Sequence, residues 1–178
     1  MKSNKVGIGQ NLPCNINNNQ NKIVQQSNKP ISPQLGDLAN FINTYNKMLS
    51  NNDAMLIADV IMRVSNYHRV DYRVVTALVA IESGFNPCAK SPSGAMGLGQ
   101  LMPTTARGLN VNNPFDPNDN LNGAVKLLRS HLESYQGDIN FALAAYKMGS
   151  GTVSRRGINQ STTIGYIKKI RSIYDRVP

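Results

Sequence analysis

The sequence predicts a single, mainly α-helical domain. Beyond residue 35, hydrophobic residues recur at intervals of three and four, which is the spacing of one face of a helix. The alternation of apolar and polar residues that indicates a half-buried strand is almost absent. The chain has 178 residues and is 40% hydrophobic, which is enough for one domain with its own core. We therefore expect one globular domain over residues 35–178.

The first 34 residues differ in composition from the rest of the chain. They contain eight asparagines and five glutamines, with few large apolar side chains. Such a segment cannot bury enough apolar surface to order a core. We expect residues 1–34 to form a flexible N-terminal arm that closes with Pro30 and Pro33.

Three helices are predicted in the first half of the domain. Apolar spacing runs over residues 36–49, and the Asn-Asn-Asp run at 51–53 ends this helix and caps the next. The second helix carries the apolar face of residues 56–64. Asp71 is a suitable N-cap for a third helix, residues 72–83, whose centre is almost entirely apolar.

Four more helices are predicted after a loop rich in glycine and proline, residues 84–101. Pro103 favours the first turn of a short helix over residues 104–109. Gly149 and Gly151 are expected to end the second of the three longer helices. The apolar spacing places these longer helices at 121–135, 139–146 and 162–174.

The charge of the chain limits its partners. The net charge is +9, with 19 Lys and Arg against 10 Asp and Glu, which favours an anionic partner such as nucleic acid, anionic lipid or an acidic wall polymer. No nucleic-acid motif accompanies the charge, so we expect no nucleic-acid partner. No apolar run is long enough for a transmembrane segment, and residues 1–34 lack the apolar part of a signal peptide. The chain is therefore either cytoplasmic as written or has lost a targeting segment.

The two cysteines, Cys14 and Cys88, lie far apart in the sequence. A disulfide between them would hold the arm beside the loop at 84–101 and would require an oxidising compartment. Two unpaired thiols are the alternative. Two cysteines form no recognisable framework, so both interpretations stay open.

Histidines and glycines form no recognisable metal, nucleophile or phosphate site. His68 and His131 belong to no ligand cluster and pair with no nucleophile, and His131 is expected at the boundary or surface of its helix. Gly94, Gly97 and Gly99 lack the lysine–serine pair of a phosphate loop. We expect no metal and no cofactor.

Glu82 is the strongest candidate for catalysis. It is one of two glutamates, and it lies between the apolar segment 74–81 and the glycine-rich loop. The negative C-terminal end of the helix dipole and desolvation both raise the pKa of a carboxyl there, which favours the protonated form that a general acid needs. A helix-end residue paired with a lysine is an equally good interpretation of the spacing alone. Glu133, the other glutamate, is expected to face solvent.

Three segments carry a family resemblance. Within residues 80–106 the informative positions are Glu82-Ser83, Asn86-Pro87, Ser91-Pro92, Gly94-Ala95, Gly97-Leu98, Gln100 and Met102-Pro103. Residues 144–146 (Ala-Ala-Tyr) with Gly149, and residues 163–166 (Thr-Ile-Gly-Tyr), follow in order. Together they resemble the catalytic domain of the soluble lytic transglycosylase family over residues 53–178. Three ordered motifs are a far more specific match than any single pattern.

The resemblance implies a fold and a reaction. The fold would be lysozyme-like, of the goose-type and lytic transglycosylase kind, and mainly α. The family cleaves the β-1,4 bond between N-acetylmuramic acid and N-acetylglucosamine in peptidoglycan without water, leaving a 1,6-anhydro end. Glu82 would be the single catalytic carboxyl, first as general acid and then as general base. The substrate implies an extracytoplasmic monomer, in the periplasm or cell wall, whose further partners would be envelope or secretion-machinery proteins.

The resemblance also implies roles for seven other residues. Ser83 would orient the surroundings of Glu82, and Tyr146 would hydrogen-bond its carboxyl. The remaining residues would line the saccharide groove: Ser91, Gly97, Gln100, Met102 and Tyr166.

Two positions depart from the family pattern. Lys147 stands where Asn is usual, and Gly99 stands where Met or Trp is frequent. A lysine in the cleft would lower the pKa of Glu82, so we expect Lys147 to point outward or toward acidic stem peptides. The chain contains no Trp, so sugar binding would depend on tyrosines and hydrogen bonds.

Two alternative functions stay open. One is a hydrolytic muramidase on the same fold, with a water placed by an aspartate such as Asp116 or Asp119. The other is a peptidoglycan-binding module of an envelope-spanning assembly that has lost turnover, which the departures at Gly99 and Lys147 would favour.

Overall fold

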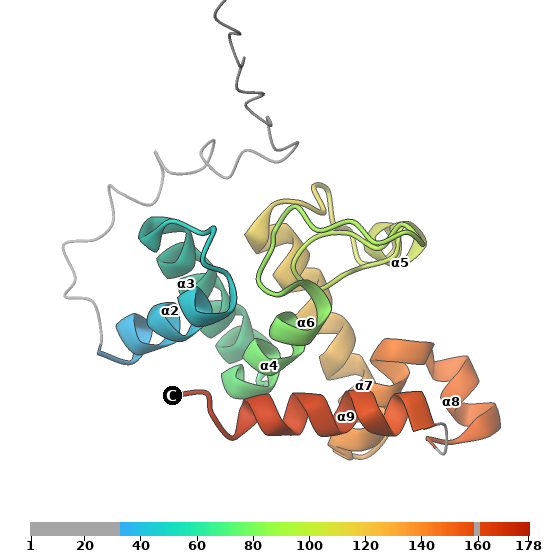
Figure 1. The fold of residues 1–178 in the computed structure, drawn as a ribbon. Coiled ribbons are helices and arrows are strands. Elements are labelled where there is room, and N and C mark those ends of the chain that lie inside the picture. Colours follow the sequence, from blue (N-terminus) through green and yellow to red (C-terminus); the bar gives the residue numbers. More distant parts are fainter. Residues whose placement is uncertain (1–32, 159–160) are drawn as a thin grey trace, which may run out of the picture.

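The computed structural model describes residues 33–158 and 161–178. Within these ranges the chain forms eight helices and no β-strand longer than an isolated bridge, as Figure 1 shows. The prediction of a mainly α fold is confirmed. The helices are α2 (Pro33–Tyr45), α3 (Asn51–His68), α4 (Tyr72–Ser83), α5 (Pro103–Gly108), α6 (Pro117–Ser134), α7 (Ile139–Met148), α8 (Ser150–Arg156) and α9 (Ser161–Tyr174).

One hydrophobic core joins most of these helices. α2 packs on α3, and α3 also contacts α4 and α6. α4 and α7 both pack against α9, and α6 packs against α7, so α4 lies near the middle of the molecule (Figure 1). Large side chains buried in this core include Leu38, Ile42, Ile57, Ile61, Leu78, Leu121, Leu128, Leu143 and Ile170.

α4 begins and ends where the sequence predicts. The Asp71 side chain accepts a hydrogen bond from the Arg73 amide at 2.9 Å, which caps the first turn. Gly84 adopts the left-handed conformation, with φ of 57°, and ends the helix. Residues 75–80 are buried in succession. The last turn, residues 81–83, is partly exposed, so the buried helix reaches the surface at its C-terminal end.

The segment between α4 and α5, residues 85–102, folds back on itself. Met96 pairs with Lys90 and with Leu101 as isolated antiparallel bridges. Phe85 and Leu98 are fully buried and anchor the segment to the core. The chain reversal between these anchors holds the glycines of this segment beside α6.

Three details differ from the sequence analysis. α8 was not predicted, because Gly149 and Gly151 suggested an end to helical structure. α2 begins at Pro33, two residues inside the predicted arm, and the rest of the arm, including Cys14, lies outside the described residues. His131 is only 9% exposed, because α3 and α7 both cover α6.

Among the described residues, none of the helices is both long and apolar enough to cross a membrane.

Candidate active site

Glu82 lies in the last turn of α4, where the helix meets the 85–102 segment. Its side chain is partly buried. Burial raises the pKa of Glu82 above the ordinary value, against a hydrogen bond from Tyr166 and the positive charge of Lys147, which both lower it. The net direction is upward, so the carboxyl takes up a proton more readily than an ordinary glutamate does. This is the property that the sequence analysis expected at this position.

Tyr166 holds the carboxyl of Glu82. Its hydroxyl donates a hydrogen bond to Glu82 Oε1 at 2.5 Å, from the second turn of α9. The tyrosine is only 7% exposed, and burial, together with the charge of Glu82, raises the pKa of Tyr166 well above its ordinary value. The phenol therefore remains a donor at neutral pH and limits the orientations available to the carboxyl.

Tyr146 of α7 lies near Glu82 but does not bond to it. Its hydroxyl donates to the backbone oxygen of Gly99 at 2.7 Å. Burial, followed by the negative charge of Glu82, raises the pKa of Tyr146, so this phenol also remains protonated. The prediction that Tyr146 hydrogen-bonds Glu82 was wrong. A phenol carries one proton, and Tyr146 gives that proton to the loop while Tyr166 serves the carboxyl.

Lys147 lies over the same tyrosine. Its ammonium nitrogen is 5.2 Å from the centre of the Tyr166 ring, within range of a cation–π interaction. The side chain is exposed, yet its charge reaches Glu82 and lowers the pKa of the carboxyl. Lys147 is thus exposed, as expected, but it also lies close enough to Glu82 to act on it, and its contact with acidic stem peptides stays a prediction. The three side chains form one electrostatic unit, in which lysine and phenol favour the carboxylate and burial favours the acid.

Asn120 ties the glycine-rich loop to α6. It is 1% exposed, and its amide oxygen accepts the Gly99 N–H at 2.7 Å. Its amide nitrogen donates to the backbone oxygens of Met96 at 3.0 Å and Pro114 at 2.8 Å. The sequence analysis missed this residue, because a lone asparagine on an amphipathic helix is usually assigned to the solvent face.

The glycines of the loop allow this close approach. A Cβ on Gly97 would lie 2.0 Å from the Pro114 oxygen and 2.3 Å from the Asn120 amide nitrogen, and the residue has a φ of 73°. A Cβ on Gly99 would lie 2.5 Å from the Ala124 Cβ. Gly97 thus serves packing inside the protein, and the departure at Gly99 fits a site with no room for a side chain.

Ser91 and Gln100 maintain the shape of the same loop. The Ser91 hydroxyl accepts the Ala95 N–H at 2.9 Å. The Gln100 amide donates to the backbone oxygens of Gly97 at 2.9 Å and Ala89 at 3.2 Å, while Gln100 itself has a positive φ of 50°. Both side chains are engaged in the loop, so their expected contact with sugar stays a prediction.

Ser83 and Met102 lie at opposite ends of the segment. The Ser83 hydroxyl donates to the Val79 carbonyl at 3.2 Å, within its own helix. Met102 precedes α5 and is 41% exposed, and its expected contact with sugar stays a prediction. The possible disulfide between Cys14 and Cys88, one of two alternatives that the sequence left open, involves Cys14, which lies outside the described residues.

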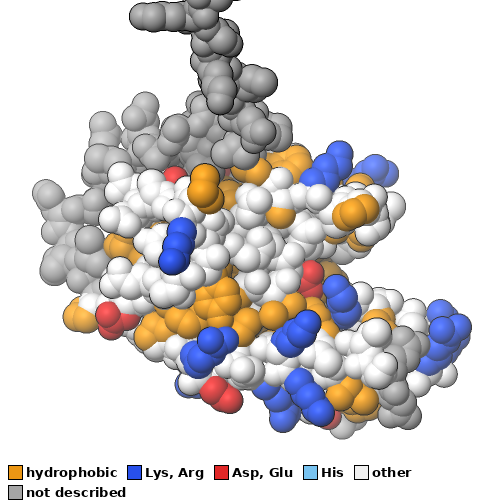
Figure 2. Space-filling view, viewed as in Figure 1, with side chains coloured by type: hydrophobic (Ala, Val, Ile, Leu, Met, Phe, Trp, Pro, Cys, Tyr) orange, Lys and Arg blue, Asp and Glu red, His pale blue; other side chains and the backbone are white. Residues whose placement is uncertain are grey.

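One side of the molecular surface is hollowed. Figure 2 shows a notch between the part of the molecule that carries α5 and the part that carries α8 and α9. An acidic side chain lies at its inner end, with a basic side chain beside it. The described residues contain no cluster of three or more His, Cys, Asp or Glu that could hold a metal ion.

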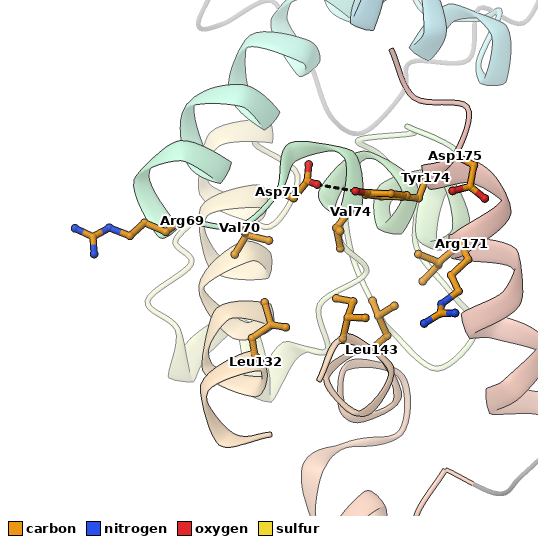
Figure 3. Close-up of a pocket in the computed structure, with 11 residues that line it drawn as sticks. Arg69, Val70, Asp71, Val74, Leu132, Leu143, Arg171, Tyr174 and Asp175 are labelled. Atoms are coloured by element: carbon orange, nitrogen blue, oxygen red, sulfur yellow. Dashed lines mark hydrogen bonds between the residues drawn. The ribbon is translucent and has the colours of Figure 1, made fainter. Parts of the chain in front are cut away.

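A separate cavity of about 550 Å³ lies between α4, α6, α7 and α9. Figure 3 shows its largely aliphatic wall, with Leu132 and Leu143 on one side and Val70 and Val74 on the other. Its carboxylate Asp71 accepts a hydrogen bond from Tyr174 at 2.9 Å (Figure 3). None of the catalytic candidates lines this cavity.

A family model, the Transglycosylase SLT domain, matches residues 59–167. The chain belongs to this family. The matched range contains Glu82, Tyr146, Lys147 and Tyr166, which come from three helices of the SLT domain. The resemblance noted in the sequence is thereby confirmed.

Relatives of this SLT domain are larger proteins. The transglycosylase of Enterobacteria phage PRD1 is 46% identical over 92 residues, which are 52% of this chain and 34% of the phage protein. The membrane-bound lytic murein transglycosylase F of Vibrio cholerae is 41% identical over 87 residues, which are 46% of this chain and 16% of that protein. The chain thus matches about a third of one relative and a sixth of the other.

Solved structures confirm the lysozyme-like fold of the SLT domain. The 70-kDa soluble lytic transglycosylase from Escherichia coli superposes with a TM-score of 0.61 at 24% identity, over 79% of this chain and 27% of that one. An inactive mutant of the lytic transglycosylase Slt from Pseudomonas aeruginosa gives a TM-score of 0.61 at 22% identity, over 65% of this chain and 23% of that one.

Proposed function

We propose that this protein is a peptidoglycan lytic transglycosylase, with Glu82 as its single general acid and base. The observation that carries the proposal is the partly buried Glu82 carboxyl, whose pKa is raised by burial and whose Oε1 accepts the Tyr166 hydroxyl at 2.5 Å. A carboxyl that is protonated more readily than usual, and held in one orientation, suits proton transfer to a glycosidic oxygen.

In the first step Glu82 acts as the acid. The protonated carboxyl gives its proton to the oxygen that links N-acetylmuramic acid to N-acetylglucosamine, and the bond from muramoyl C1 to that oxygen breaks. The departing N-acetylglucosamine keeps the oxygen as a hydroxyl. The N-acetyl group of the muramoyl residue supports C1 as the bond breaks, so the protein needs no carboxylate nucleophile.

In the second step Glu82 acts as the base. The carboxylate takes the proton of the muramoyl C6 hydroxyl while that oxygen bonds to C1, which closes the 1,6-anhydro ring. No water is consumed, and Glu82 is again protonated and ready for the next cycle. Lys147 and Tyr166 both stabilise the carboxylate form, which is the state of Glu82 between the two steps.

The electrostatic environment supports one carboxyl rather than two. The groups that shift the pKa of Glu82 are Tyr166 and Lys147, and no second carboxylate is among them. Asp116 caps α6 by accepting the Asp119 N–H at 3.0 Å, and Asp119 accepts the Asn113 N–H at 3.0 Å. Both aspartates are thus engaged in the turn before α6, which gives the muramidase alternative no supporting observation.

The proposed substrate also implies a location and partners for the protein. We infer that the protein acts on peptidoglycan strands outside the cytoplasm, in the periplasm or cell wall, as a monomer. The net charge of +9 suits an acidic wall polymer, and one relative is by name a membrane-bound murein transglycosylase. Envelope or secretion-machinery proteins are the further partners that such a location provides.

Mass spectrometry of muropeptides released from purified sacculi tests the function. Wild type should release products that are one water lighter than hydrolytic ones, and Glu82→Gln should release none, because an amide cannot shuttle a proton. Hydrated reducing ends would establish a muramidase instead. Binding to sacculi without any release would establish a wall-binding module.

A further inference from the structure

A groove of about 460 Å³ runs between α3 and the start of α6, on the side of α6 that faces away from the glycine-rich loop. Asn120 contacts that loop, and its neighbours at 118 and 122 lie about 200° around the helix from it, since each residue turns a helix by about 100°. The groove is therefore separate from Glu82. Its principal lining residues are Arg63, Val64, Tyr67, Asn118 and Asn122.

The two walls of the groove are matched rows. Arg63 and Tyr67 are one turn apart on α3, and Asn118 and Asn122 are one turn apart on α6. Val64 is buried between the rows and forms an apolar floor. The two rows thus lie side by side. α3 presents guanidinium and aromatic groups, and α6 presents amide groups, to a ligand that lies along the groove.

Both asparagines are oriented by their neighbours. Arg63 donates to Asn118 Oδ1 at 2.7 Å, and because a guanidinium can only donate, the amide oxygen must face it. His68 Nε2 lies 2.7 Å from Asn122 Oδ1. Among the described residues, neither amide nitrogen has a hydrogen-bond acceptor. Both NH₂ groups are thus left as donors for an incoming acceptor.

Tyr67 supplies a flat apolar surface in the same groove. It is 78% exposed, which is unusual for a large aromatic side chain. The centre of its ring lies 4.9 Å from the centre of the His68 ring, and the two rings are nearly perpendicular. Because most of the side chain is exposed, ring surface is open to a ligand in the groove. A sugar ring places its axial C–H groups against such a face and its acetamido and hydroxyl oxygens toward neighbouring donors.

The charge of the groove favours contact with uncharged groups of a ligand. Arg63 is neutralised by Asp59 at 2.8 Å, and Asp119 also lines the groove. A groove in which the positive charge is already matched suits the neutral, hydrogen-bonding sugar groups of the wall polymer more than its acidic groups. N-acetylated sugars offer an acetamido oxygen, hydroxyls and apolar ring faces together.

We propose that the groove between α3 and α6 is a second glycan-binding site, which holds an N-acetylated strand of the same polymer away from the catalytic residues. The inference rests on the proposed function for the identity of the polymer. The site increases the residence of the protein on an extended strand or on intact sacculi, through effective concentration at the cleft. Its effect is therefore on binding to long substrate and not on proton transfer at Glu82.

Co-sedimentation with purified sacculi tests the proposal, in Glu82→Gln protein so that the substrate stays intact. Tyr67→Ala should weaken binding roughly five- to tenfold, by removing the aromatic face. The double variant Asn118→Asp with Asn122→Asp should weaken it similarly. This double variant keeps the oxygens that accept from Arg63 and His68, so its melting temperature should not fall. It removes the amide donors and also adds two negative charges, so its binding is compared with wild type at high salt, which screens those charges.

Met48→Ala provides the matched control. Met48 is 93% exposed on the connection between α2 and α3, outside the groove, so its removal should leave sacculus binding unchanged. In the active enzyme, Tyr67→Ala should raise the KM for sacculi far more than it changes kcat. Binding of both groove variants equal to that of the Met48→Ala control would overturn the groove as a glycan site.

The two proposals fail in different ways. If wild type releases anhydro products and the groove variants bind unchanged, the proposed glycan site in the groove is rejected and the proposed transglycosylase activity stands. If wild type releases no products and the groove variants lose binding, the proposed transglycosylase activity is rejected. The groove would then be the binding site of a wall-binding module.

Discussion

The hydroxyl of Tyr166 donates to Glu82 Oε1 at 2.5 Å, between residues that are 84 positions apart in the sequence. α4 and α9 pack against each other, and this packing places the two side chains face to face. Lys147, from α7, lies above the tyrosine ring at 5.2 Å. Three helices thus determine how readily the Glu82 carboxyl is protonated and where it points.

Tyr166→Phe tests the positioning of the acid. The variant keeps the ring under Lys147 and removes only the donor, so the carboxyl gains rotational freedom. We expect kcat to fall roughly 10- to 100-fold with a smaller change in KM. In wild type the Tyr166 hydrogen bond lowers the pKa of Glu82, so its removal raises that pKa. The alkaline limb of the kcat profile should therefore move to higher pH. Tyr135→Phe, which removes a phenol outside the site, is the control. If Tyr166→Phe changes neither kcat nor its pH profile, Tyr166 has only a structural role.

Lys147 should set the upper pH limit of activity. Its charge lowers the pKa of Glu82, and the acid step requires the protonated carboxyl, so removal of the charge extends activity to higher pH. Lys147→Met should shift the alkaline limb upward, and Lys147→Arg, which keeps the charge, should leave it in place. The shift should shrink at high salt, because the lysine is exposed. Identical profiles for Met and Arg variants would contradict this role.

Glu82→Gln should stabilise the protein at neutral pH. Burial raises the pKa of Glu82 in the folded state, so the folded protein holds this proton more tightly than the unfolded chain does. The stability that the group contributes is complete below the ordinary pKa of 4.5, and it declines as pH rises through the folded-state value. The melting temperature of the variant should therefore exceed that of wild type at pH 7, and the gap should close near pH 4. A variant less stable than wild type at pH 7 would contradict the raised pKa.

Asn120→Ala should release the glycine-rich loop. The substitution removes three hydrogen bonds at a residue that is 1% exposed and leaves the Gly99 amide without its acceptor. We expect a loss of about 2–4 kcal/mol in the free energy of unfolding, measured with urea. Activity should fall by roughly tenfold or more even where the protein remains folded, because the loop positions the cleft. Asn112→Ala, at a nearby exposed position, should change neither quantity.

Local sequence patterns predicted most of the helices for a physical reason. A helix that buries one face must repeat apolar residues at intervals of three and four, so the pattern is visible without the partner helix. α4 was predicted with its observed bounds, because Asp71 and Gly84 are local cap signals. α8 escaped prediction because it is short and Val153 is its one buried residue, which leaves no periodic signal.

What the sequence by itself determined is the helical fold, the family and the place of Glu82 at the end of a buried helix, since these depend on neighbours in the chain. Tertiary structure alone decided which phenol serves the carboxyl, where Lys147 points and why Asn120 is buried. These depend on contacts between helices, and Tyr146 and Tyr166 both lie on amphipathic helices whose periodicity is the same whichever of them faces Glu82. Only the packing of α7 and α9 around α4 distinguishes the two, because a hydrogen bond requires a distance and a direction that no local pattern contains.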